Sequence, residues 1–150
     1  VTAAGLATRS PFARSAAVLV LARIVFEYGR QPDVRAQLPR LLPLVLQLLR
    51  HRQREEVKSC LAFVRAALRA MSADEMRPLL PDLVAAVLQW PGEELKLRFR
   101  KRVRFVLERL VRRVSLEEVA AVVPAADAKL IAHMRRSIDR KRRRHTGRGA

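Results

Sequence analysis

The chain has few of the residue types on which many catalytic and metal sites depend. Its one cysteine, Cys60, rules out an intrachain disulfide and favours a reducing compartment. The five glycines form no Gly-rich phosphate loop, and the three histidines lie far apart in the sequence and show no metal-ligand spacing with each other or with Cys60. No nucleophile motif of the kind that hydrolases use is present. We therefore expect a protein that is not an enzyme and needs no cofactor and no metal.

Strand-forming residues and long hydrophobic runs are scarce as well. Aromatic residues make up 5% of the chain, which is dominated by leucine, alanine, valine and arginine. This composition favours an all-helical protein, and a hydrophobic content of 50% is too high for overall disorder. No apolar run reaches the roughly 18 residues that a membrane-spanning helix needs.

Positive charge, by contrast, is abundant and concentrated near the C-terminus. Residues 95–113 hold nine basic residues and one acid, residues 135–148 hold eight and one, and together they carry 15 of the 17 net positive charges. Such a cationic end predicts a polyanionic partner, with nucleic acid the first candidate and an acidic protein or an anionic membrane the next. The candidate RNA-binding residues are Lys96, Arg98, Arg100, Lys101, Arg102, Arg104, Arg109, Arg112, Arg113, Arg140, Lys141, Arg142, Arg143 and Arg144.

Helix-capping signals divide the chain clearly. Ser10-Pro11 and Gly29 frame a first helix, and Ser72 and Ser115 each open a capping box. We predict Pro39 to mark a bend or the true start of the second helix. The predicted helices span residues 11–28, 33–50, 53–70, 73–90, 93–113, 116–123 and 125–140. We predict a linker at 1–9, one domain at 10–140 and a basic tail at 141–150, into which the last helix dissolves.

An internal repeat accompanies these helices. The first, third and fifth predicted helices align without gaps at offsets of 44 and 42 residues, so that Leu19 and Val20 share apolar seam positions with the later helices. Helix pairs that recur about every 40 residues are typical of HEAT and armadillo arrays. We predict an all-α fold, a HEAT/armadillo-like helical-repeat solenoid of about three helix pairs plus a C-terminal helix. The alternative is a non-repetitive helical bundle with chance matches.

The fifth helix combines an apolar stripe with two basic flanks. Phe99, Val103, Val106 and Leu110 recur at helical spacing, and the one acid among the surrounding cations is Glu108. The basic residues form two sets, Arg98, Arg102 and Arg109 on one flank and Lys101, Arg104 and Arg112 on the other. Like charges on successive turns repel each other, and a bound anion relieves this repulsion. The alternatives are a merely solvated basic face, or arginines paired with acids elsewhere in the parent protein.

Two single residues and the tail complete the candidates. Cys60 is predicted to fill the core, and Trp90 to anchor packing, with base stacking as the less favoured role. The run that begins at Arg140 suits a nuclear or nucleolar targeting signal or a flexible RNA-binding arm, with an inert solvated tail as the alternative. Because this run lacks interleaved aromatic residues, we expect it to contact phosphates and to recognise the shape of the RNA, not to recognise specific bases.

Four segments resemble the C-terminal HEAT repeats of the ribosomal RNA processing protein twelve family. They are residues 10–17, 57–64, 76–81 and 97–110, and the resemblance extends over about residues 10–140. It implies a karyopherin-like scaffold without catalytic residues in the nucleus and nucleolus, acting in assembly and export of the small-subunit precursor. The implied partners are precursor ribosomal RNA, assembly factors, ribosomal proteins and export machinery, with no membrane among them. It also implies a longer parent chain.

Two other functions remain open from the sequence. A transport adaptor would use the basic surface to bind acidic proteins. An enzyme of the HEAT-like DNA glycosylase type has fold-level analogy as its support, and such an enzyme needs an acid and aromatic residues in a basic cleft. The acids of this chain lie mostly in capping boxes or first turns, where the helix dipole explains them.

Overall fold

A computed structural model describes residues 10–50, 54–90 and 92–148, and these ranges contain helices and no strand. The predicted linker at 1–9 lies outside them. The elements are α2 (Pro11–Tyr28), α3 (Pro32–Leu49), α4 (Arg54–Ala70), α5 (Ala73–Met76), the 3-10 helix η1 (Arg77–Leu79), α6 (Leu80–Leu88), α7 (Glu93–Arg113), α8 (Leu116–Val122), the 3-10 helix η2 (Ala125–Asp127) and α9 (Ala128–Arg148).

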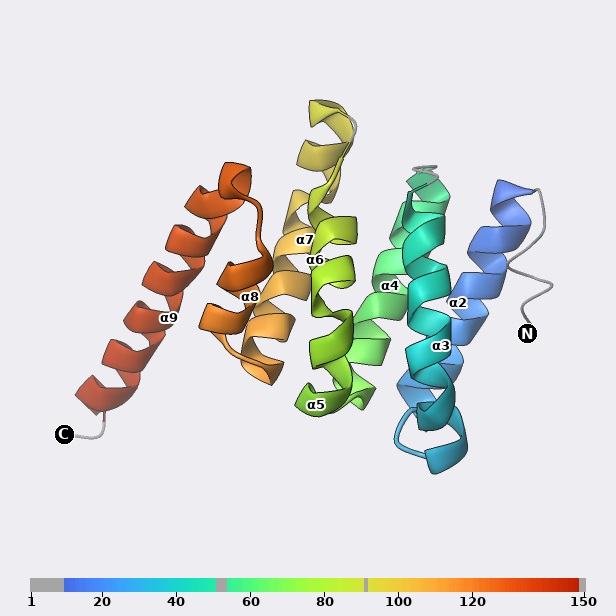
Figure 1. The fold of residues 1–150 in the computed structure, drawn as a ribbon, viewed down its shortest axis with the longest axis horizontal. Helices are drawn as coiled ribbons and strands as arrows, with labels where there is room; N and C mark the ends of the chain where they lie inside the picture. The colour runs from blue at the N-terminus through green and yellow to red at the C-terminus, as the bar shows by residue number, and fades with distance from the viewer. Residues whose placement is uncertain (1–9, 51–53, 91, 149–150) are drawn as a thin grey trace.

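The helices form two layers with one helix at the end (Figure 1). One layer consists of α2, α4 and α7, which pack in that order, and the other of α3, α6 and α8. The layers join through contacts of α3 with α4 and of α7 with α8, and α9 follows against α8. This arrangement of stacked helix pairs confirms the predicted all-α helical-repeat fold.

Apolar side chains between the layers form one continuous core. In α7 the predicted stripe is buried, with Val106 and Leu110 fully so. Cys60 is also fully buried and fills the core as predicted, and burial raises the pKa of its thiol to about 12. Trp90 stacks on Phe99 with ring centroids 5.8 Å apart, and its indole N–H donates to the Val87 carbonyl, which agrees with a packing role.

A polar contact crosses the seam between α2 and α4. Arg14 donates from Nη2 to Oε1 of Glu56 at 2.6 Å, and Glu56 is 1% exposed. The ends of these helices also lie close together, because a Cβ added to Gly29 would lie 2.8 Å from the Cβ of Ala70. Gly29 therefore both ends α2, as predicted, and allows the two backbones to approach each other.

The prolines act differently in the two helices that contain them. Pro39 and Pro43 lie within α3, which begins at Pro32, so the predicted start at Pro39 is wrong, whereas the alternative of a bend there stays a prediction. Buried residues along one face of α3, including Leu38 and Leu42, offset the missing hydrogen bonds. The uninterrupted helix predicted at 73–90 is also wrong, because the chain passes through η1 at Pro78 before α6 begins.

Two further predictions need correction. The last helix does not dissolve at Arg140 but continues to Arg148, and residues 140–146 contain no glycine or proline to stop it. Leu19 and Val20 are not seam residues, since they are 50% and 45% exposed on α2.

Candidate nucleic-acid interface

The structure divides the basic residues of α7 between different surfaces. Arg98, Arg102 and Arg109 follow one another with Phe105 at spacings of three and four residues, so they share a side of the helix. Arg98 and Arg102 are exposed and Arg109 is partly exposed. We call these three residues the outer arginine face, which agrees with the first predicted flank. The second flank is divided, because Arg104 and Arg112 line different hollows.

The outer arginine face adjoins aromatic side chains of the α2–α4–α7 layer. The guanidinium carbon of Arg65 in α4 lies 4.2 Å from the ring centroid of Phe105, and that of Arg109 lies 5.3 Å from it. Arg69 lies over Phe26 of α2 in the same way, at 4.8 Å. We call these five residues the arginine–phenylalanine surface.

A shallow hollow of about 290 Å³ lies along the arginine–phenylalanine surface, and no carboxylate occurs among the described residues that line it. The sequence did not reveal Arg65 and Arg69 as candidates, because an isolated arginine on a helix carries no signal by itself. Only the packing of α2, α4 and α7 brings these two arginines beside the rings.

A second hollow lies between α7 and α9. Lys96, Arg100 and Arg104 recur every fourth residue of α7 and line it from one side. It has a volume of about 490 Å³. We call it the α7–α9 groove. Its other polar or aromatic lining residues are Trp90, Glu93, Asp127, Lys129, His133 and Arg136.

Positive charges in the α7–α9 groove act on its histidine. Nη2 of Arg104 contacts Nε2 of His133, and a guanidinium can only donate. Nε2 is therefore the acceptor in this contact. The charge of Arg104 contributes most to a lowered pKa of His133, followed by burial and by the charges of Arg136, Arg140 and Arg100.

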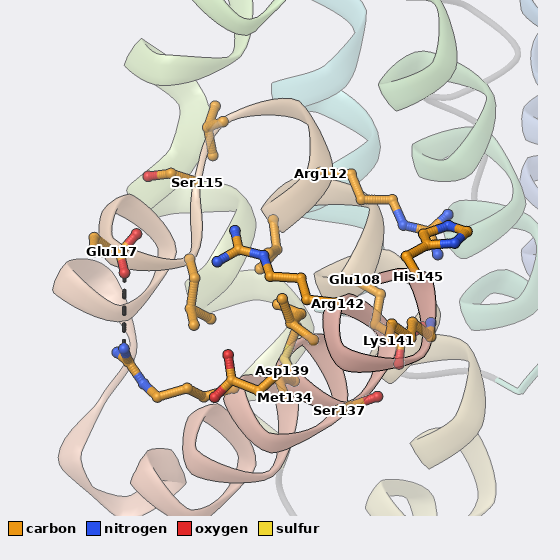
Figure 2. A pocket seen from close by; sticks show the side chains of 15 residues that line it. Glu108, Arg112, Ser115, Glu117, Met134, Ser137, Asp139, Lys141, Arg142 and His145 are labelled. Atoms are coloured by element: carbon orange, nitrogen blue, oxygen red, sulfur yellow. Dashed lines mark ion pairs between the residues drawn. The ribbon is translucent and has the colours of Figure 1, made fainter. Parts of the chain in front are cut away.

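A third hollow, the α8–α9 pocket, also has a volume of about 490 Å³ (Figure 2). Figure 2 labels Arg112 from α7 and Lys141, Arg142 and His145 from α9 among the residues that line it. Three carboxylates line this pocket too, and one of them, Glu117, forms an ion pair with Arg135 at 3.8 Å. The pocket is therefore closer to neutral than the α7–α9 groove.

The remaining candidates stand apart from these surfaces. Arg113 donates from Nη2 to the carbonyl of Arg69 at 2.7 Å, which ties α7 to the end of α4 and indicates a structural role. Arg140, Arg143 and Arg144 are exposed along α9 and line none of the three hollows. Some candidates therefore lie together around the hollows, whereas Arg140, Arg143 and Arg144 lie along the exposed side of α9.

Ion pairing separates the candidates from the arginines of the scaffold. Arg14, Arg35 and Arg77 pair with Glu56, Glu75 and Glu118, each of which lies on another helix. Of the fourteen candidates, by contrast, Lys96 and Arg104 alone have a carboxylate within 4.0 Å among the described residues. The cationic end therefore retains charge that the fold does not neutralise.

Comparison with known proteins gives relatives over nearly the whole chain. A putative ribosomal RNA-processing protein 12 from Schizosaccharomyces pombe is 31% identical over 147 residues, which are 96% of this chain and 12% of that protein. By sequence, the chain is related to the ribosomal RNA-processing protein 12 family. Ribosomal RNA-processing protein 12 of Saccharomyces cerevisiae is 28% identical over 144 residues, with the same two shares.

A third relative comes from a vertebrate. The RRP12-like protein of Gallus gallus is 28% identical over 139 residues, which are 91% of this chain and 10% of that protein. No protein-family profile matches the chain. The resemblance inferred from the sequence is confirmed, and the chain spans 12% of the length of each of its two yeast relatives.

Within the described residues, no helix is both long and apolar enough to cross a membrane. No group of three or more histidine, cysteine, aspartate or glutamate side chains in those residues is arranged to hold a metal ion.

Proposed function

We propose that this chain is a non-catalytic scaffold in ribosome biogenesis, which binds precursor ribosomal RNA together with assembly factors and ribosomal proteins. The names of its relatives support a role in ribosome biogenesis. The observation that carries RNA binding is the unneutralised charge of the cationic end, where twelve of the fourteen candidates have no carboxylate within 4.0 Å among the described residues. We place this action in maturation and export of the small-subunit precursor, in the nucleus and nucleolus.

Phosphate binding follows from the chemistry of the outer arginine face. Each guanidinium presents a planar set of N–H donors that matches two phosphate oxygens. Among the described residues these three arginines have no ion pair that would have to break first. Neutralised phosphates release condensed counterions, so binding depends steeply on salt. The two-layer repeat holds α7 in place and needs no catalytic group for this task.

The test is binding of the 150-residue chain to a fluorescent structured RNA at two salt concentrations. With roughly six to ten phosphate contacts, affinity should fall about 10³- to 10⁵-fold between 50 and 200 mM salt. Reversing the outer arginine face with R98E/R102E/R109E should weaken binding strongly. The matched control R30E/R40E/R54E changes the net charge equally at exposed sites outside the two basic blocks. Equal losses in both triple variants would mean that net charge alone attracts RNA, and no loss in either would refute the proposal.

A second candidate function is docking of an acidic protein segment. The arginine–phenylalanine surface favours it, because guanidinium groups stacked on rings keep their N–H edges available for carboxylates. The test is binding of a synthetic peptide rich in glutamate and phenylalanine to the wild type and to R65E/R69E. Tight binding that R65E/R69E abolishes and RNA does not displace would support this adaptor function. Peptide binding that R65E/R69E leaves unchanged would dismiss it.

A further inference from the structure

The α7–α9 groove has an apolar wall that phosphate binding alone does not require. Leu97 lines the groove, and 61% of this apolar residue is exposed to solvent. Trp90 lines the same hollow, and its stacking on Phe99 fixes the orientation of the indole ring. A flat apolar group that entered the groove would therefore meet a preformed surface.

The charge of the groove is unbalanced as well as concentrated. Two of its cations, Arg100 on α7 and Arg136 on α9, have no carboxylate within 4.0 Å among the described residues. Lys129 is a further cation of the lining that has no carboxylate within 4.0 Å among the described residues. The two acids in the lining are Glu93, which is 4.0 Å from Lys96, and Asp127 of η2. Five cations thus share the groove with two carboxylates, and a bound anion would lower the resulting repulsion.

We propose that the α7–α9 groove binds one unpaired nucleotide of an RNA strand. Arg100, Arg104 and Arg136 hold its phosphate, and Leu97 and Trp90 receive its base. This inference rests on the proposed RNA-binding function and adds Arg136, Leu97 and Trp90 to the residues that carry it. A volume of about 490 Å³ lies in the range of roughly 300–1,000 Å³ typical of small-molecule sites.

The groove selects an unpaired nucleotide for a geometric reason. In a duplex the bases are stacked and paired inside the helix, so phosphate and base face cannot enter one hollow together. An unpaired base can turn outward and stack on an apolar or aromatic side chain. Because every base has such a face, the groove distinguishes single strands from duplexes more than it distinguishes sequences.

His133 reports on occupancy of the groove. A phosphate beside it opposes the arginine charges that lower its pKa, so binding raises the pKa and takes up a proton. Affinity should then increase as pH falls through the titration of His133. The charged groups around His133 are Lys96, Arg100 and Arg104 on α7, Glu93 at its start, Asp127 on η2, and Lys129, Arg136 and Arg140 on α9.

The decisive experiment compares a fluorescent ten-residue single-stranded RNA with an RNA duplex of the same length. The groove variant R100Q/R136Q and the outer-face variant R98Q/R102Q remove the same charge, one arginine pair from each surface. The groove variant should weaken single-strand binding by about tenfold more than duplex binding. The outer-face variant should weaken both RNAs alike. L97S, at an exposed site, should weaken only the single strand.

The outcomes separate this inference from the function on which it rests. If R100Q/R136Q and L97S weaken single-strand and duplex binding by equal factors, as is expected of R98Q/R102Q, the groove holds no nucleotide. The proposed RNA binding would still stand in that case. If no variant lowers affinity for either RNA, RNA binding itself fails. A phosphoserine peptide is the third ligand, and tighter groove-dependent binding of that peptide than of RNA would overturn the inference. The imidazole signals of His133 in NMR should show a higher pKa with the single strand bound.

Discussion

The ion pair between Arg14 and Glu56 predicts how strongly α2 is held to α4. Glu56 is 1% exposed, and it accepts from Nε of Arg14 at 3.0 Å and from Nη2 at 2.6 Å. Replacing Arg14 with methionine keeps much of the side-chain volume but leaves the buried carboxylate without this cation. Removing one partner of a buried pair costs about 3–5 kcal/mol, so R14M should lower the free energy of unfolding by about that amount.

The assay is urea denaturation followed by circular dichroism at 222 nm. A second variant, R14M/E56L, removes both charges and fills the same space with apolar atoms, so it should recover most of the lost free energy. The exposed pair of Arg23 and Glu27 provides the control, because R23M breaks a pair on the surface of α2 and should cost at most about 1 kcal/mol. A loss below about 1 kcal/mol for R14M, or a double variant as unstable as R14M, would refute the reasoning.

Three further predictions concern stability and reactivity. Cys60 should resist maleimide at pH 8 in the folded chain and react once urea unfolds it, because it is fully buried and its thiol pKa is raised to about 12; rapid labelling without urea would contradict its burial. G29A should lower the melting temperature by an amount equivalent to about 1–3 kcal/mol, since its Cβ would lie 2.8 Å from that of Ala70; an unchanged melting temperature would show that the backbones move apart at no cost. The hydrogen bond from Arg35 holds the pKa of Glu75 below its usual value, so Glu75 stabilises the fold above its unfolded pKa, and this contribution is lost as pH falls through the folded pKa. E75Q should therefore be less stable than the wild type at pH 7 and nearly equal to it at pH 2, by urea denaturation; an equal deficit at both pH values would contradict the assignment.

Much of the helical architecture could be predicted from local sequence. The predicted bounds 11–28 and 93–113 match α2 and α7, and the Ser72 and Ser115 side chains each accept a hydrogen bond from a glutamate N–H three residues on. These capping signals act within one turn of a helix, so they can be recognised from the local sequence without knowledge of the fold. The predictions of a helix start at Pro39 and of an uninterrupted helix through Pro78 were wrong because tertiary packing determines the backbone conformation there. Pro39 is tolerated because the opposite face of α3 is buried, whereas the chain around Pro78 takes the 3-10 form.

The candidate interface shows the same division. The sequence identified the cationic end, because charge density is a property of composition, and it grouped Arg98 with Arg102 and Arg109, because they share a helical spacing. It did not pair Arg104 with His133, which lies 29 residues away on α9.

A repeat of helix pairs with a basic end is thus predictable from the chain alone, since caps, periodicity and charge are set by neighbours along the chain. Which basic residues face one another across a groove, and which meet aromatic rings, follows from the packing of the helices. That choice depends on how side chains about 40 residues apart pack to fix the rotation and spacing of each helix.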